Sequence, residues 1–229
     1  MIGAALPRVE DARFLSGRGR YVADLELPRM LHVAFLRSPH AHARIERIDM
    51  RAARRAPGVV ACLTGEELRA YVRPLRAPSR LRDYRPTDFP ALALGKVRHA
   101  GEAVAVVVAA DRYLAEDALE LITVEYTPLP VVGDVQAALS DDAVLVHEEA
   151  GANVLLSRTF AQGDVEAVFR TAAVVVGDRF RFHRHAGVAM ENRACLARWD
   201  AGDGSLTLWS STQIPGRSEE RRVGKECRL

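Results

Sequence analysis

Two pairs of histidines stand at a spacing that could bind a metal ion. His40 and His42 form one pair, in "HAH", and His183 and His185 form the other, in "HRH". On a β-strand, side chains two residues apart point to the same face, so both imidazoles of a pair could reach one ion. The spacing shows no cysteine or carboxylate that would supply a third or fourth ligand. Ordinary buried or surface histidines are therefore favoured, with metal ligation as the alternative.

The three cysteines, Cys62, Cys195 and Cys227, include no C-x-x-C pair. A sparse, odd count is typical of reduced thiols and argues against a disulfide framework. It also leaves no thiolate set for an iron–sulfur cluster in this chain. Cys62 and Cys195 lie inside apolar runs that read as strands, so we predict that both are buried small hydrophobic residues and not nucleophiles.

The net charge of +2 comes entirely from the end of the chain. Residues 217–229 hold five of the 32 Lys and Arg residues and three of the 30 Asp and Glu residues, so the rest is neutral. A nucleic-acid-binding function would depend on this tail alone. We therefore expect no nucleic-acid partner.

The composition is that of a soluble globular protein, with 48% hydrophobic and 27% charged residues. The longest apolar runs, such as "AVAVVVAA", are far shorter than the roughly 20 residues of a membrane span. Pro7, Arg8 and Glu10 interrupt the N-terminus before the apolar core of a signal peptide could form. We predict a cytoplasmic location.

Alternating strand and helix patterns occupy residues 20–130 and predict an α/β or α+β domain. Asp49, Asp111 and the pair Thr64 and Glu67 stand where helix caps belong. A proline-rich, charged stretch at 73–97 reads as a loop, and the arm at 1–20 as irregular. Strands are predicted at 31–38, 59–65, 102–110 and 123–126, and helices at 49–56, 67–72 and 112–122.

The pattern restarts after "TPLPVVGD". Asp134 and Asp164 are expected to cap two helices, and a Gly- and Asp-rich turn at 201–204 separates two alternating runs that indicate a hairpin. The predicted elements are helices at 134–140 and 165–172, strands at 153–160, 194–200 and 205–212, and an extended stretch at 173–185.

The order of several phrases resembles one protein family. "GRGRYVADLELPRMLHVAFLRSPHAHARI", "KVRHAGEAVAVVVAADRYLAEDALELITVEYTPLPVV", "GDVEAVF" and "LTLWSSTQIP" follow one another at compatible spacings. Together they resemble the start of the large, molybdopterin-binding chain of the molybdenum hydroxylases, which include xanthine dehydrogenase, aldehyde oxidase and aerobic carbon monoxide dehydrogenase. The resemblance covers residues 3–215.

The resemblance implies an α+β fold: an a/b hammerhead domain followed by the truncated start of a molybdopterin-binding domain. The expected divisions are an N-terminal arm at 1–17, the hammerhead at 18–130, and an incomplete molybdopterin-binding domain at 131–216. Residues 217–229 contain "RSEERRVGKEC", which resembles a translated sequencing adapter. We therefore expect this tail to be non-native.

The resemblance also implies an enzyme that hydroxylates a small carbon substrate with oxygen derived from water. Gln213, in "STQ", matches the family's glutamine that hydrogen-bonds near the molybdenum; the alternative is a glutamine that merely ends a hairpin strand. A neutral amide can donate there without adding charge. The family's catalytic glutamate lies beyond this chain, so no glutamate here inherits that role, and Glu191 in "AMENR" is not the base.

By the same resemblance, the full-length protein would hold a molybdenum-molybdopterin cofactor, in its cytosine dinucleotide form. Its partners would be an FAD-binding medium subunit and a [2Fe-2S] small subunit, assembled as a dimer of heterotrimers. This chain alone is expected to bind no complete cofactor and to be inactive. Two alternatives stay open: a stand-alone hammerhead-like module that docks onto redox partners, and a nucleic-acid-binding protein that uses the tail.

Overall fold

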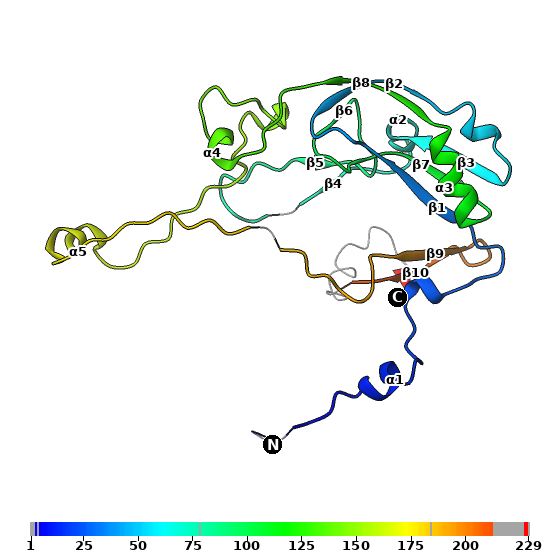
Figure 1. Ribbon diagram of the computed structural model, residues 1–229, viewed down its shortest axis with the longest axis horizontal. Coiled ribbons are helices and arrows are strands. Elements are labelled where there is room, and N and C mark those ends of the chain that lie inside the picture. The colour runs from blue at the N-terminus through cyan, green and yellow to red at the C-terminus, as the bar shows by residue number, and fades with distance from the viewer. Residues whose placement is uncertain (1–2, 4, 78, 184, 213–226, 229) are drawn as a thin grey trace. The chain divides into compact units, whose positions relative to one another are not determined.

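The computed structural model describes residues 3, 5–77, 79–183, 185–212 and 227–228, which fall into two compact units (Figure 1). The sheet unit comprises the described residues within 29–175. The hairpin unit comprises those within 1–28 and 176–229. Gln213 and the tail, apart from residues 227–228, lie outside the described residues.

Strand β7 (Ala103–Ala109) is the centre of the first sheet. β1 (His32–Arg37) and β3 (Val59–Thr64) pair with its two edges, both antiparallel, which makes the order β1-β7-β3. The β7 sequence AVAVVVA is apolar without interruption and mostly buried, as expected for a strand that is covered on both faces. The predicted strands at 31–38, 59–65 and 102–110 are thereby confirmed.

Helix α3 (Arg112–Glu120) packs on one face of this sheet (Figure 1). Asp111 caps it as predicted, because its Oδ1 accepts a hydrogen bond from Tyr113 N at 2.7 Å. Ala115 and Ala118 face the sheet and are 1% exposed. The buried residues of this core are Met50, Ala53, Cys62, Ala105, Val107, Ala109, Ala115, Ala118 and Ile122.

A second sheet has the order β6-β2-β8 and is also antiparallel. Its strands are β6 (Lys96–Val97), β2 (Ala43–Asp49) and β8 (Thr123–Pro128). The register of β2 against β8 shifts between Ile45 and Arg47, which is a β-bulge. The second core cluster joins this sheet to β7 and consists of Ala43, Ala93, Val97 and Val104.

The other elements of the sheet unit are short. Thr64 and Glu67 form the predicted reciprocal capping box at the start of α2. Asp134 and Asp164 cap α4 and α5 through their carboxylates, also as predicted. These elements are η2 (Ala53–Arg55), α2 (Gly65–Leu68), β4 (Leu75–Arg76) paired with β5 (Asp88–Phe89), α4 (Val135–Ala138), η3 (Glu148–Ala150) and α5 (Val165–Thr171).

The hairpin unit contains the predicted antiparallel pair at its centre. β9 pairs with β10 from Cys195 opposite Ser210 to Asp200 opposite Ser205, and β11 lies parallel to β10. The elements of this unit are α1 (Asp11–Leu15), η1 (Val22–Asp24), β9 (Cys195–Asp200), β10 (Ser205–Ser210) and β11 (Cys227–Arg228).

Two predicted elements are wrong, and the helix expected at 67–72 begins earlier and is shorter, since α2 spans Gly65–Leu68. The helix expected at 49–56 is only the 3-10 turn η2, because Asp49 is the last residue of β2 and the chain turns directly after it. The strand expected at 153–160 does not form: Leu155 O accepts one hydrogen bond, from Arg85 N at 2.8 Å, but no strand ladder includes this stretch. Apolar and β-branched residues favour an extended chain, but a strand also needs a neighbouring strand to pair with.

Further differences concern exposure and short elements. Cys195 is exposed and not buried as predicted, whereas Cys62 is buried. β9 carries Cys195 on a small sheet that leaves this side chain open, and burial needs a second layer. The loop expected at 73–97 contains β4, β5 and β6, and the arm expected to be irregular contains α1. β2 was not predicted at all.

None of the helices in the described part of the chain has the length and apolar character that a bilayer crossing requires.

Candidate functional site

The β9–β10 hairpin leads directly to the "STQ" motif. Ser211, the first residue of the motif, continues the pairing beyond β10, since its N donates to Ala194 O at 3.1 Å. Its hydroxyl accepts a hydrogen bond from Ala194 N at 2.9 Å and donates to Asn192 O at 3.1 Å. Ser211 is therefore fixed to the chain before β9. Gln213 follows two residues later, outside the described residues, and its role near the cofactor stays a prediction.

Glu191 has a structural contact of its own. Its Oε1 accepts a hydrogen bond from Val22 N, the first residue of η1, at 2.9 Å. This bond joins residues 169 positions apart within the hairpin unit. A carboxylate that accepts a backbone N–H hydrogen bond in this way has a structural partner. The geometry thus gives Glu191 a structural role, which differs from proton transfer.

The histidines of the first pair do not face a common point. His42 is 5% exposed, and its Nδ1 lies 2.7 Å from Pro130 O. The His40 ring instead lies against Tyr126, with the ring centroids 4.8 Å apart. His183 and His185 are exposed. Among the described residues, no group of three or more His, Cys, Asp or Glu side chains could hold a metal ion, so the metal alternative has no support there.

A buried polar cluster around Ser38 escaped the sequence reasoning. Ser38 is 3% exposed, its N donates to Glu102 O at 2.9 Å, and its hydroxyl accepts from His40 N at 3.0 Å. Burial raises the pKa of the Tyr126 hydroxyl, and a hydrogen bond with Ser38 partly offsets this shift. The signal was present in the polar run "SPHAH" between two strands. This cluster ties the residues after β1 to Glu102, directly before β7, and to Tyr126 in β8.

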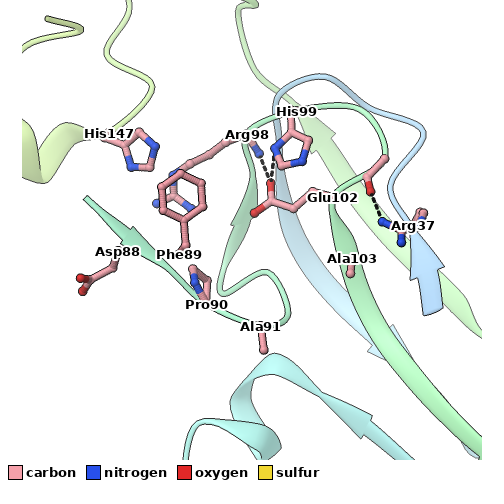
Figure 2. Close-up of a pocket in the computed structure, with 11 residues that line it drawn as sticks. Arg37, Asp88, Phe89, Pro90, Ala91, Arg98, His99, Glu102, Ala103 and His147 are labelled. Carbon is pink, nitrogen blue, oxygen red and sulfur yellow. Dashed lines mark hydrogen bonds and ion pairs between the residues drawn. The ribbon is translucent and has the colours of Figure 1, made fainter. Parts of the chain in front are cut away.

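A cavity of about 190 Å³ opens in the sheet unit near this cluster (Figure 2). Its walls come from the end of β1, from β5 and the residues after it, from the β6–β7 turn and from His147. Figure 2 shows Phe89 and His147 on one side and His99 with Glu102 on another. The lining residues are Arg37, Asp88, Phe89, Pro90, Ala91, Arg98, His99, Gly101, Glu102, Ala103 and His147.

The turn between β6 and β7 is held by its own polar contacts. Glu102 Oε2 accepts a hydrogen bond from Arg98 N at 2.6 Å and lies 3.6 Å from His99 Nδ1. Arg37 Nη1 donates to Gly101 O at 2.8 Å, which fixes the turn to the end of β1 (Figure 2). These contacts fix the β6–β7 turn and attach it to the end of β1, so this part of the cavity wall is held by hydrogen bonds within the sheet unit.

Two family models match the chain. Residues 16–130 match the family described as "Aldehyde oxidase and xanthine dehydrogenase, a/b hammerhead domain", and residues 146–221 match "Molybdopterin cofactor-binding domain". The chain belongs to the molybdenum hydroxylase large-subunit family. It is an N-terminal portion of such a subunit, and the predicted α+β fold of a hammerhead domain followed by part of a molybdopterin-binding domain is confirmed. The boundaries predicted at residues 17, 130 and 216 stay predictions.

Relatives of known name cover nearly all of this chain. It is 42% identical to the carbon monoxide dehydrogenase large chain of Afipia carboxidovorans, over 93% of this chain and 27% of that protein. It is 38% identical to the nicotine 6-hydroxylase large subunit of Paenarthrobacter nicotinovorans, over 94% of this chain and 26% of that protein. The crystal structure of quinoline 2-oxidoreductase from Pseudomonas putida 86 superposes with a TM-score of 0.87 and 40% identity, over 94% of this chain and 27% of that one. The chain thus spans about a quarter of the length of these relatives.

A molybdopterin-binding domain implies a molybdenum cofactor in the full protein. The described residues between 176 and 194 form neither helix nor strand. Their large apolar side chains are open to solvent, with Phe182 89% and Met190 93% exposed. Such an open stretch encloses no water-excluding pocket. Within the described residues, this stretch by itself does not form a site that fits this cofactor.

Proposed function

We propose that this chain is the first part of the large subunit of a molybdenum-dependent hydroxylase or dehydrogenase. The whole enzyme would oxidise a small carbon substrate with water-derived oxygen and pass the electrons to iron–sulfur and FAD subunits. The observation that carries this proposal is identity of 42% and 38% to two large subunits along more than nine tenths of the chain. The names of these relatives, with that of the quinoline enzyme, favour carbon monoxide, nicotine-like or quinoline-like substrates as the first to test.

Each unit would have its own task. The sheet unit holds two buried clusters and so supplies a rigid scaffold. The hairpin unit would carry Gln213 to the cofactor, because Ser211 fixes the strand that precedes it. There the amide would donate a hydrogen bond without adding charge. The cytosine dinucleotide form of molybdopterin, a cytoplasmic location and a dimer of heterotrimers belong to the same proposal.

The genomic template tests whether the subunit is longer. We expect an open frame that continues past the codon for Pro215, beside frames for an iron–sulfur subunit and a flavin subunit. A stop codon directly after residue 229 would contradict the proposal. Metal analysis gives a second test, since the purified 229-residue chain should retain almost no molybdenum, and close to one equivalent would contradict that expectation.

Gln213 is tested in the complete enzyme, expressed with its partner subunits. Gln213→Ala should lower the rate of substrate-dependent dye reduction at unchanged molybdenum content, whereas Gln136→Ala, an exposed glutamine at the start of α4, should change neither. Equal rates for both variants would show that Gln213 merely ends a strand.

A docking function without catalysis is the second candidate. The observation in its favour is that both buried clusters lie within residues 29–175, so this unit has a core that needs no cofactor. The two candidates differ in one measurement. A docking module would bind iron–sulfur and flavin subunits in a pull-down even though its own gene ended at residue 229, and no electron transfer to dye would occur with any substrate.

A further inference from the structure

Arg98 lines the cavity of the sheet unit, and the Nε of its guanidinium forms no hydrogen bond with any described residue. This Nε is buried. The backbone N of Arg98 donates a hydrogen bond to Glu102 Oε2 at 2.6 Å. Figure 2 shows the side chain extending from the β6–β7 turn toward Phe89 and His147. A buried donor without a partner is costly, so a guanidinium in this state favours binding of an anion.

The carboxylates near Arg98 do not serve as the anion for its guanidinium, because each of them is paired with another residue. The charge of Arg98 acts on Glu148 and Glu149 and helps to lower the pKa of both, but the largest cause of each shift is a hydrogen bond with a different residue. The pairs are Asp88 with Arg76 (2.7 Å), Glu102 with His99 (3.6 Å), Glu148 with Lys96 (2.6 Å) and Glu149 with His147 (2.9 Å).

The remaining wall of the cavity is apolar. Phe89, Pro90, Ala91 and Ala103 contribute it, and the Phe89 ring lies 6.5 Å from the His147 ring, measured between centroids. The volume of about 190 Å³ corresponds to about six waters at roughly 30 Å³ each. It is below the roughly 300 Å³ at which pockets for drug-sized ligands begin. One ring with one small substituent fits this space.

We propose that this cavity binds a small aromatic monocarboxylate, with the carboxylate on the Arg98 guanidinium and the ring beside Phe89. A planar carboxylate matches the planar guanidinium with two parallel hydrogen bonds. An aromatic ring gains from an offset or tilted arrangement with Phe89. The four surrounding carboxylates disfavour a dianion such as phosphate, which they would repel more strongly than a monoanion. This site lies in the hammerhead domain and goes beyond the proposed function.

Benzoate is the probe, and the 229-residue chain is titrated with it while amide and imidazole resonances are followed by NMR. We expect saturable binding with a Kd of about 1 mM, and shifts confined to residues around the cavity. Absence of saturation up to about 10 mM benzoate would overturn the proposal. So would tighter binding of inorganic phosphate than of benzoate.

Three variants separate the contributions of the Arg98 guanidinium, the Phe89 ring and the overall charge to benzoate binding. Arg98→Gln should weaken benzoate binding about tenfold or more, because a charge-assisted pair is lost. Arg82→Gln removes an exposed charge elsewhere on the sheet unit and should leave binding unchanged. Phe89→Leu, at a side chain 55% exposed, should weaken binding about threefold. Far-UV circular dichroism confirms that each variant is folded, and unchanged affinity in both the Arg98 and Phe89 variants would overturn the proposal.

Discussion

The turn at Gly58 provides a sharp test of how α3 is held on the sheet. Gly58 has a φ of +74°, and its carbonyl accepts a hydrogen bond from Ala110 N at 2.9 Å, next to the Asp111 cap. A Cβ added at Gly58 would lie 2.5 Å from Leu114 Cδ1. Leu114 packs against the first core cluster. Gly58→Ala therefore strains the backbone and displaces a core side chain at once.

The two contributions can be separated by comparing glycines. A non-glycine residue in the left-handed region costs about 1 kcal/mol or slightly more, and moving Leu114 out of place costs about 1–2 kcal/mol. We expect Gly58→Ala to lower the free energy of unfolding by about 2–3 kcal/mol. Gly95→Ala, with a φ of +66° and open space around its Cβ, should lose only about 1 kcal/mol. Gly133→Ala has neither problem and should lie within about 0.5 kcal/mol of the parent.

Urea unfolding provides the measurement. Ellipticity at about 222 nm reports mainly on helices such as α3, whereas both tryptophans, Trp199 and Trp209, lie in the hairpin unit and report on it through their fluorescence. The ellipticity midpoint should fall in the order parent, Gly95→Ala, Gly58→Ala. If the Gly58 and Gly95 variants lose the same free energy, the packing of Leu114 over this turn is refuted.

Asp111→Ala should lower the free energy of unfolding by about 1 kcal/mol, measured by the same urea titration, because α3 loses its N-cap. The ion pair with Lys96 lowers the pKa of Glu148, so its stabilisation is present above the ordinary carboxyl pKa of 4.5 and lost as the pH falls through the lowered value. Lys96→Met should thus flatten the dependence of the urea midpoint on pH below about pH 5. Because Glu148 is largely exposed, the effect on the free energy of unfolding should stay below about 0.5 kcal/mol. An unchanged dependence on pH would contradict this. Burial raises the pKa of the Cys62 thiol, so mass spectrometry should find iodoacetamide on Cys195 long before Cys62.

The sequence was sufficient wherever the cause is local. The caps at Asp111 and Asp164 and the capping box at Thr64 were predictable, because a cap needs only a side chain and the next three backbone N–H groups. The apolar run of β7 and the two alternating halves of the β9–β10 hairpin were equally clear. The order of the quoted sequence motifs also indicated the family, because the resemblance extends along nearly the whole chain.

The bulge in β2 shows where sequence reasoning failed. An extra residue between Ile45 and Arg47 shifts the register of β2 against β8. Ala43 and Ile45 therefore fit one period-two alternation, and Ile48 falls outside it. A period-two search loses the strand at that point. At 153–160 the reverse occurs, since apolar and β-branched residues favour an extended chain but no strand ladder forms there among the described residues.

The sequence by itself therefore determined the local elements of this chain and its membership of the molybdenum hydroxylase family. Only the tertiary structure decided that His40 and His42 separate, that Cys195 is exposed, and that the Arg98 Nε is buried without a hydrogen-bond partner among the described residues. Local elements depend on side chains within a few residues of one another. Burial, pairing and cavities depend on segments that are far apart in the chain and meet only when it folds.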